Sequence, residues 1–272
     1  LDAGKGQGKI IASDKLRLKA LLESKKHVLN FNVPECGKIK LRVFWYANAD
    51  LTQGKVHISE GNYPQWDSLI ASFPGVFRHN GIYYLVYEGA NNITDEFRGD
   101  IGLATSTDGL NFIKHQSNPI LENSSESSSF ESANIGTPSL YRENGVWYLY
   151  YHGFDWVDCQ LGVAVGKDIT KLKKYSDIPI LKTVDGTFES GTIGKRSSIW
   201  KSPDTGYYYF AYECSTERPY NQARWSTALA RSKDKLNWEK YNSNPIIPIC
   251  DGFGNDGPEI IQFNGQTYLY VR

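Results

Sequence analysis

Ionisable side chains recur at matching places in this chain, although they lie far apart in the sequence. Glu88 and Glu213 each follow a run of aromatic and aliphatic residues, and His152 stands at the same place in a third run. Asp256 and Glu259 open a further copy of the pattern. Carboxylates and imidazoles are the side chains that most often move protons in enzymes, if they lie within hydrogen-bonding reach of their partners. These residues are therefore candidates for acid–base chemistry if the fold brings them together.

The elements that carry these residues repeat about every sixty residues, which is a sign of a repeat architecture. The clearest copy is residues 136–153: an apolar run, the turn Asn144-Gly145 and an aromatic run. Asn-Gly favours the positive φ angles of a tight turn, and aromatic residues pack well on a sheet, so the segment predicts a β-hairpin. The other copies begin at residues 72, 194 and 256.

Two further strands follow each complete hairpin. The third strands are rich in small residues and are expected at 101–106, 161–166 and 227–232. The fourth strands carry an aromatic residue, which is Phe112, Tyr175 or Trp238. Four antiparallel strands in each period are typical of a propeller blade.

We therefore predict an all-β fold, a five-bladed β-propeller with four-stranded antiparallel blades, in one domain over residues 1–272. The expected blades are residues 28–71, 73–122, 136–182, 194–249, and 256–272 together with 9–19. N-terminal strands at 9–13 and 16–18 would complete the last blade, and such closure removes exposed sheet edges. The alternative for this region is a short helix at 14–26 with Asp14 as its N-cap.

Composition argues against several classes of function. The 30 basic and 30 acidic side chains cancel, so no strong field favours nucleic acid or an anionic membrane surface. The longest apolar runs are strand-sized, so we expect no membrane span, and the first residues show no signal peptide. The cysteines lack CxxC or metal-finger spacing and are interpreted as buried thiols. They are Cys36, Cys159, Cys214 and Cys250.

Each acidic candidate also has a structural interpretation. Glu88 and Glu213 could be surface carboxylates at strand ends, and His152 could be a structural histidine. Asp256 could be a turn residue, since Asn-Asp-Gly is favourable turn chemistry. The repeated Phe-Glu-Ser segments, which contain Glu131 and Glu189, could tie a loop that enters a blade.

The first strand of each blade lines the central channel of a propeller, so aligned residues of these strands should converge. Lys195 and Arg196 replace an apolar pair found in the other copies. We therefore expect at least one cation that faces the channel.

The last hairpin carries a family signal. It contains Pro-Glu-Ile at 258–260, Phe-Asn-Gly at 263–265 and Tyr-Leu-Tyr at 268–270. This pattern resembles the blade hairpin of five-bladed-propeller glycosidases. These are glycoside hydrolase family 43 and its furanosidase and β-mannoside phosphorylase relatives, among them families 32, 62, 68, 117 and 130. The early-blade Asp-Pro usual in those families is replaced here by Phe73-Pro74 and Thr137-Pro138.

The resemblance implies a glycoside hydrolase with an Asp from a first strand as base or nucleophile, a Glu as general acid and a third carboxylate that tunes the acid. We expect Asp256 to be the ionised group, because a nearby cation such as Arg196 or Lys195 lowers the pKa of an acid. Glu213 is the expected acid, because partial burial raises the pKa of a carboxyl group. Glu88 is its rival or the tuning group.

A carbohydrate is then the expected substrate or ligand. The expected contact residues are His152, Arg196, Lys195, Glu259, Trp156 and Trp225. Trp156 and Trp225, on loops between second and third strands, would stack on sugar faces. No nucleotide or redox cofactor is needed, whereas a calcium ion in the channel is compatible with the resemblance.

A glycan-directed role favours a secreted or periplasmic location. The alternative function is a non-catalytic propeller that binds carbohydrate or recognises a receptor. A further alternative is a protein-scaffold propeller, which would show an exposed apolar patch in place of a pocket.

Overall fold

The computed structural model describes residues 28–33, 37–42, 61, 65–91, 98–217, 223–249, 257–263 and 266–271. The chain divides into two compact units, Leu1–Lys55 with Ile249–Phe253 and Val56–Pro248 with Gly254–Arg272. The predicted N-terminal strands, the alternative helix at 14–26 and Asp256 lie outside the described residues. In the smaller unit, β1 (Val28–Val33) pairs antiparallel with β2 (Gly37–Arg42).

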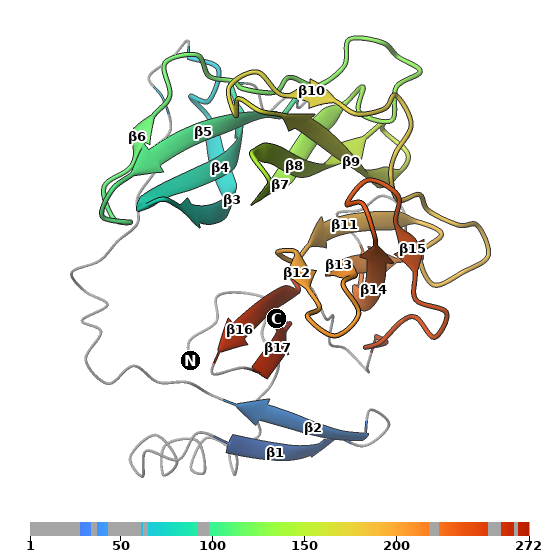
Figure 1. The fold of residues 1–272 in the computed structure, drawn as a ribbon. Helices are drawn as coiled ribbons and strands as arrows, with labels where there is room; N and C mark the ends of the chain where they lie inside the picture. Colours follow the sequence, from blue (N-terminus) through green and yellow to red (C-terminus); the bar gives the residue numbers. More distant parts are fainter. Residues whose placement is uncertain are drawn as a thin grey trace. The chain divides into compact units, whose positions relative to one another are not determined.

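An antiparallel arrangement of four successive strands recurs three times in the larger unit, and we call these copies repeats A, B and C (Figure 1). Repeat A is a sheet of its own, whereas repeats B and C are joined into one nine-stranded sheet by a parallel contact between Thr192 and Cys159. Repeat A consists of β3 (Ile70–His79), β4 (Ile82–Ala90), β5 (Asp100–Ser106) and β6 (Ile113–Lys114). Repeat B consists of β7 (Asn134–Glu143), β8 (Val146–Phe154), β9 (Cys159–Gly166) and β10 (Lys173–Lys174). All described secondary structure is strand, so the all-β class is confirmed.

Repeat C consists of β11 (Thr192–Arg196), β12 (Trp200–Lys201), β13 (Tyr208–Ser215), β14 (Ser226–Ser232) and β15 (Glu239–Lys240). Its first strand is interrupted between β11 and β12. At the interruption the Ala211 N–H donates to the side-chain oxygen of Ser197 at 2.9 Å, where a regular sheet would use a backbone carbonyl. A last hairpin pairs β16 (Glu259–Phe263) with β17 (Gln266–Tyr270). The blade count and the closure of the ring stay predictions.

The predicted Asn-Gly hairpin is confirmed. β7 and β8 pair up to Glu143 opposite Val146, with Asn144 and Gly145 at φ 51° and 79°. The turn between β3 and β4 is built in the same way, with Asn80 at 49° and Gly81 at 79°. Two consecutive positive φ angles are what a two-residue turn needs to match the twist of its strands.

The first strand of each repeat, which we call its inner strand, contains a β-bulge at a matching position. The pairing skips between Ser72 and Gly75 in β3 and between Gly136 and Ser139 in β7. In β11 the shift lies between Ile193 and Arg196. Such bulges re-aim side chains and are common beside active sites.

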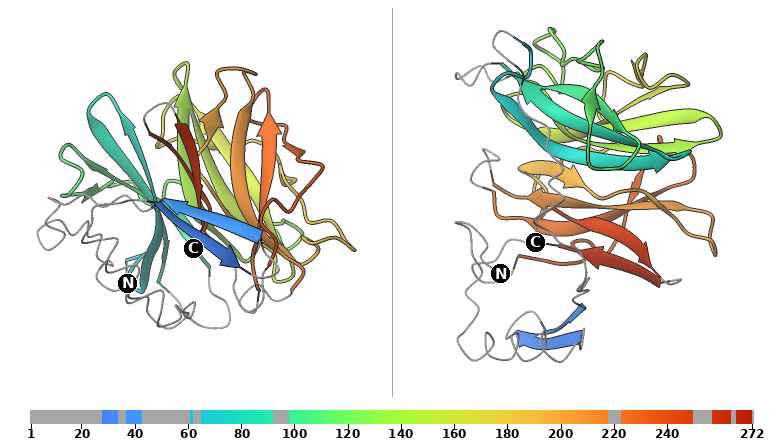
Figure 2. Two further views of the ribbon diagram at one scale, coloured as in Figure 1. Left: turned by 90° about the horizontal axis from the view of Figure 1, so that it is seen from below. Right: turned by 90° about the vertical axis from the view of Figure 1, so that its left-hand side faces the viewer.

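The core lies between successive repeats, which Figure 2 shows as twisted layers within the larger unit. Large side chains of the second strands are fully buried, among them Val86, Leu149, Tyr150, Phe210 and Tyr212. Burying one such side chain is worth about 1.5–3 kcal/mol. The aromatic runs therefore supply packing between sheets, which fixes the strand ends that carry the candidate residues.

A buried acid also recurs where the chain enters each repeat. In repeat C, Glu189 accepts the Tyr212 hydroxyl at 2.9 Å and pairs with Lys240 Nζ at 2.5 Å. Asp67 with Tyr87 and Lys114 repeats this arrangement in repeat A, at 2.8 and 2.5 Å, and Glu131 pairs with Lys174 at 2.8 Å in repeat B. The Phe-Glu-Ser segments thus tie entry loops to outer strands, which is the structural interpretation of Glu131 and Glu189.

Candidate active site at the inner-strand bulges

Glu88 and His152, from two different repeats, belong to one closed ring of hydrogen bonds. Glu88 Oε1 accepts from Asn134 Nδ2 at 3.2 Å, and Glu88 Oε2 accepts the Thr137 N–H at 3.2 Å. His152 Nε2 lies 3.0 Å from Asn134 Oδ1, and His152 Nδ1 lies 2.8 Å from Thr137 Oγ1. The ring joins the end of β4 to the bulge of β7 and the end of β8.

Gly136 makes room for this ring. A Cβ atom at residue 136 would lie 1.9 Å from Glu88 Oε2 and 2.8 Å from His152 Cε1. Neither distance is compatible with a side chain. The glycine before the bulge is therefore required by the close approach of a carboxylate and an imidazole.

Burial sets the protonation of both ionisable members. Glu88 is 2% exposed, and burial raises its pKa to about 7, against the opposing hydrogen bonds from Thr137 and Asn134. Burial also lowers the pKa of His152 to about 4. The imidazole is thus neutral at neutral pH, whereas Glu88 is distributed between its protonated and ionised forms.

Glu213 occupies the matching place in repeat C but has different partners. Its Oε1 accepts the Lys195 N–H at 2.8 Å, and its Oε2 accepts the Gly257 N–H at 2.7 Å. Gly194 again leaves room, since a Cβ there would lie 2.6 Å from Glu213 Oε1. Glu213 therefore joins the bulge of its own repeat to the residue that follows Asp256.

The buried thiol of Cys159, at the start of β9, is influenced by the charges of both Glu88 and Glu213. Burial is the main cause that raises the pKa of its thiol, and the charges of both Glu88 and Glu213 raise it further. Both carboxyl groups thus act electrostatically on the same buried atom. The prediction of a buried thiol is confirmed for Cys159 and Cys214.

Arg196 is held by backbone carbonyls and aromatic rings. Its guanidinium donates to Ser197 O at 2.5 Å and Ser139 O at 3.2 Å, and lies 4.1 Å from the centre of the Tyr150 ring. The residue is 2% exposed, and burial lowers its pKa to about 10, which leaves it charged at neutral pH. These contacts favour a structural role over the expected contact with substrate.

The other predicted residues are spread around this region. Lys195 is half-buried at the bulge of β11, and the half-buried Glu259 accepts the Ser198 N–H at 3.0 Å. Trp156 is 49% exposed on the β8–β9 loop, with φ at 77°. Trp225 is half-buried just before β14. The structure thus brings Glu88 to His152, and Lys195 to Glu213.

Two members of the ring, Asn134 and Thr137, were not among the residues predicted from sequence. A signal for Asn134 exists: it aligns with Thr192 in the two Phe-Glu-Ser segments, at a polar position just before Ile-Gly. Thr137 is the residue at φ 42° in the bulge. Its backbone N–H, not its residue type, makes the contact to Glu88, and sequence alone does not show this.

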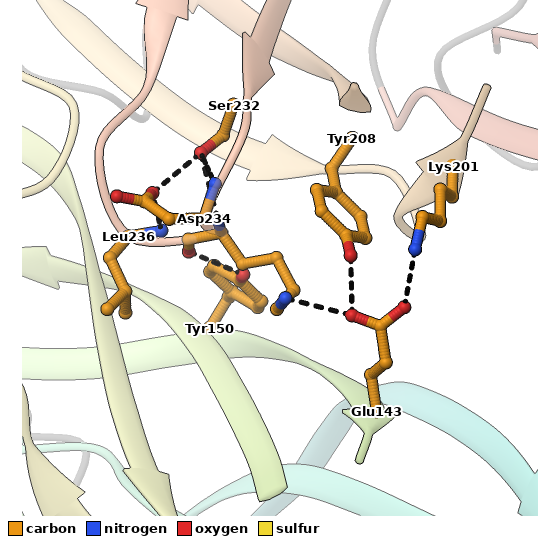
Figure 3. A network of polar contacts seen from close by, with 8 residues as sticks. Glu143, Tyr150, Lys201, Tyr208, Ser232, Asp234 and Leu236 are labelled. Atoms are coloured by element: carbon orange, nitrogen blue, oxygen red, sulfur yellow. Dashed lines mark hydrogen bonds and ion pairs between the residues drawn. The ribbon is translucent and has the colours of Figure 1, made fainter. Parts of the chain in front are cut away.

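A second polar network lies at the opposite end of β7 and links repeats B and C (Figure 3). Glu143 Oε1 accepts from Lys201 Nζ at 2.9 Å, and Oε2 accepts from Lys235 Nζ at 2.9 Å and the Tyr208 hydroxyl at 2.5 Å. Partial burial raises the pKa of Glu143, but these hydrogen bonds outweigh it and bring the pKa to about 2. This network stabilises the packing of repeats rather than placing groups at the candidate site.

Hollows are also present at the outer strands of repeat C and between the start of β15 and the segment that follows β10 in repeat B. One of about 510 Å³ is lined by Tyr209, Arg231, Glu239 and Tyr241 among others, and one of about 270 Å³ by residues including Tyr175 and Trp238. Among the described residues, no group of three or more His, Cys, Asp or Glu side chains could hold a metal ion. No helix in the described part is long and apolar enough to cross a membrane.

Solved structures share this fold. Zg3597, a family 117 glycoside hydrolase of the marine bacterium Zobellia galactanivorans, matches 79% of this chain and 67% of its own, at 17% identity and a TM-score of 0.64. Fructan 1-exohydrolase IIa of Cichorium intybus matches 70% of this chain and 35% of its own, at 18% identity and a TM-score of 0.56. The family 32 β-fructofuranosidase of Bombyx mori matches 73% and 42%, at 18% identity and a TM-score of 0.53.

These structures belong to the five-bladed β-propeller, furanosidase-like superfamily, so the resemblance in fold is confirmed. The chain spans from about a third to two thirds of the length of these relatives. No protein-family model matches the chain, and no curated protein matches its sequence.

Proposed function

We propose that this protein is a glycoside hydrolase that acts on a carbohydrate through paired carboxylates. The observation that carries the proposal is Glu88, a buried carboxyl group with a pKa of about 7 at the inner-strand bulges. A carboxylic acid that is protonated near neutral pH can donate its proton to a leaving glycosidic oxygen. The shared fold with glycoside hydrolases supports this chemistry.

The roles of the two glutamates are exchanged relative to the sequence-based expectation. Glu88 becomes the proposed acid, because its pKa is raised by burial. Glu213 accepts two backbone N–H groups, one from the bulge of its own repeat and one from Gly257 beside Asp256. We assign it to tuning the charge of the site. Asp256 stays the proposed base or nucleophile, one residue before the Gly257 N–H that binds Glu213.

In the proposed step the Glu88 proton passes to the glycosidic oxygen. The bond from the anomeric carbon to that oxygen breaks, and its electron pair stays on the leaving oxygen. The new bond at the anomeric carbon comes from Asp256 or from a water molecule that Asp256 deprotonates. The paired carboxylates carry this step without a nucleotide or redox cofactor, and a channel-bound calcium ion stays a prediction.

A furanose-containing plant or microbial glycan is the proposed substrate, in keeping with the resemblance to furanosidases. Lys195, Glu259 and Trp156 are the proposed contact residues, with the exposed indole of Trp156 as the surface for a sugar face. Trp225 belongs to the same loop region on repeat C.

A screen of synthetic aryl furanosides and pyranosides tests the function. We expect the wild type to release the aryl alcohol from at least one of them, and the Asp256→Asn variant to release none while its melting temperature stays nearly unchanged. An active Asp256→Asn variant would remove Asp256 from the mechanism. A wild type that hydrolyses no glycoside but binds glycans would instead support the non-catalytic alternative.

Non-catalytic carbohydrate binding is favoured by one observation at the bulge of β3. Phe73, in place of the family acid, is 55% exposed with φ at 49°. An exposed aromatic ring at an inner strand suits stacking on a sugar more than proton transfer. Retained glycan binding with no turnover in any glycoside would favour this second function.

We also propose that residues 9–19 complete the sheet that β16 and β17 begin, as the fifth blade. Among the described strands, β17 pairs only with β16, whereas the second strand of each repeat pairs on both sides. Deletion of residues 1–19 should lower the melting temperature by several degrees. An unchanged melting temperature would contradict closure by this segment.

A further inference from the structure

The ring around Glu88 can satisfy its hydrogen bonds in two opposite directions. In the first direction Glu88 is ionised and accepts from the Asn134 amide nitrogen. The Asn134 amide oxygen then accepts His152 Nε2–H, and His152 Nδ1 accepts the Thr137 hydroxyl. This direction uses the Nε2–H tautomer of the imidazole.

Protonation of Glu88 calls for the reverse direction. Without a substrate the Glu88 O–H needs an acceptor, and rotation of the Asn134 amide by half a turn places its oxygen there; in the proposed step the glycosidic oxygen takes the place of Asn134 as the acceptor. The amide nitrogen then donates to His152 Nε2, which must be unprotonated. The imidazole therefore carries its proton on Nδ1 and donates it to Thr137 Oγ1. The Thr137 N–H donates to Glu88 Oε2 in both directions.

We propose that Asn134, His152 and Thr137 are positioning residues for Glu88, which hold the carboxyl group in place in both protonation states by reversing the ring. Reversal has a consequence for ligand binding. The Thr137 hydroxyl hydrogen, which points to His152 when Glu88 is ionised, becomes available to a substrate oxygen when Glu88 is protonated. Thr137 is thus a substrate donor that is switched on together with the acid; this role of Thr137 rests on the proposed function.

The proton count of the reversal is simple. Glu88 takes up one proton from solvent. The imidazole keeps one proton throughout, because Nε2 loses a proton to solvent and Nδ1 takes one up. No oxidant or cofactor takes part.

Several elements surround the Glu88 carboxyl group, and some of them carry titratable groups. β3 places Ser72 opposite Glu88, and β5 places Ile101 there, with Asp100 one residue earlier. β8 contributes His152, and β9 contributes the Cys159 thiol, on which the Glu88 charge acts. Burial raises the pKa of Asp100 to about 6 and lowers that of His152 to about 4, so Glu88 is the group that titrates near neutral pH.

Long-range ¹H–¹⁵N NMR spectra of histidine-labelled protein test this proposal, because they distinguish the two neutral tautomers. In the wild type we expect His152 to change from Nε2–H to Nδ1–H as the pH falls through about 7. In Glu88→Gln we expect Nδ1–H at every pH above the pKa of His152. The glutamine oxygen accepts from Thr137 and its nitrogen donates to Asn134, as protonated Glu88 would.

Asn134→Asp should hold the ring in the opposite direction to Glu88→Gln. The aspartate oxygen that faces His152 accepts from Nε2–H, so we expect Nε2 to stay protonated throughout the same pH range, either as the Nε2–H tautomer or, because the new carboxylate raises the pKa of His152, as the imidazolium. His79 and His115 serve as internal controls, whose signals should be the same in all variants, and His152→Gln assigns the His152 signal. One unchanged tautomer in the wild type, or the same tautomer in both variants, would overturn the proposal.

These spectra need no substrate. A failed glycoside screen combined with the expected tautomer change would remove the proposed function but keep the ring. Turnover combined with a fixed tautomer would keep the function and remove the ring.

Discussion

The Thr137 amide donates a 3.2 Å hydrogen bond to Glu88 Oε2 and thereby joins the bulge of β7 to the end of β4. Gly257 and Glu213 repeat this relationship at 2.7 Å, between repeat C and the last hairpin. Both carboxylates thus connect successive elements as well as facing the candidate site. Substitutions at either glutamate should therefore be compared in stability before they are compared in activity.

Stability should decrease between about pH 6 and about pH 8 because of Glu88. Its pKa rises from the ordinary 4.5 to about 7 on folding, so the folded state binds more protons between these values. The contribution of protonated Glu88 is fully present below 4.5 and is lost as the pH rises through about 7. The whole shift corresponds to about 3 kcal/mol, of which about 1.4 kcal/mol is lost between pH 6 and pH 8.

Urea unfolding at the two pH values measures this effect, with Glu88→Gln as the comparison. Asp100 acts with the same sign at lower pH, and His152, whose pKa falls to about 4, acts with the opposite sign below 6.5. Above 6.5 the Glu88 contribution should dominate. A pH dependence that is identical in the Glu88→Gln variant would contradict this account.

Substitution of Arg196 should destabilise the protein, whereas substitution of its neighbour Lys195 should not. Arg196→Leu leaves the Ser139 and Ser197 carbonyls without their donor and removes the stacking on Tyr150, so we expect a loss of about 3 kcal/mol. Lys195→Ala keeps the backbone N–H that binds Glu213 and should change the unfolding free energy by less than about 0.5 kcal/mol. Chemical denaturation measures the free energy of unfolding of both variants, and equal losses would contradict different roles for the two residues.

Tyr212→Phe should destabilise the protein although it removes one oxygen atom. The buried Glu189 carboxylate would lose its 2.9 Å hydrogen bond from the Tyr212 hydroxyl, at a cost of about 1–3 kcal/mol. Tyr209→Phe, on the same strand but only half-buried, is the matched control and should be close to neutral. Equal melting temperatures for the two variants would contradict a stabilising role of the hydrogen bond to Glu189.

Acid should weaken the link between repeats B and C at Glu143. Hydrogen bonds from Tyr208, Lys235 and Lys201 outweigh burial and bring its folded pKa to about 2, below the ordinary 4.5. The stability from this group is therefore present above 4.5 and is lost as the pH falls toward 2. Glu143→Gln should lose stability at neutral pH and show a shallower decline in acid than the wild type. A variant as stable as the wild type at neutral pH would count against the network.

Much of the fold could be predicted from sequence, for a physical reason. Asn144-Gly145 restricts the backbone to a tight turn, and alternating aromatic residues such as Tyr150 and Tyr212 must be buried, so strand positions and pairing follow from local chemistry. The break between β11 and β12 was not predicted, because it depends on the Ser197 side chain replacing a carbonyl of the ladder.

The candidate site was predicted less completely. Glu88, Glu213 and His152 stand out because they interrupt apolar strands, and the alignment of repeats finds them. Their roles depend on partners that no alignment contains: the backbone N–H of Thr137 for Glu88, and that of Gly257 for Glu213. Arg196 looked like a channel cation in the sequence, but the Tyr150 ring and two carbonyls surround it.

The most direct test of the central claim compares two leaving groups. For a sugar that the aryl glycoside screen identifies, kcat/KM would be measured on its 4-nitrophenyl and its methyl glycoside with wild type and Glu88→Gln. If Glu88 protonates the leaving oxygen, the variant should lose about 10²–10⁴-fold on the methyl glycoside, which needs acid assistance, and far less on the 4-nitrophenyl glycoside. Equal losses on both glycosides, or wild-type rates on the methyl glycoside, would contradict the assignment of Glu88 as the acid.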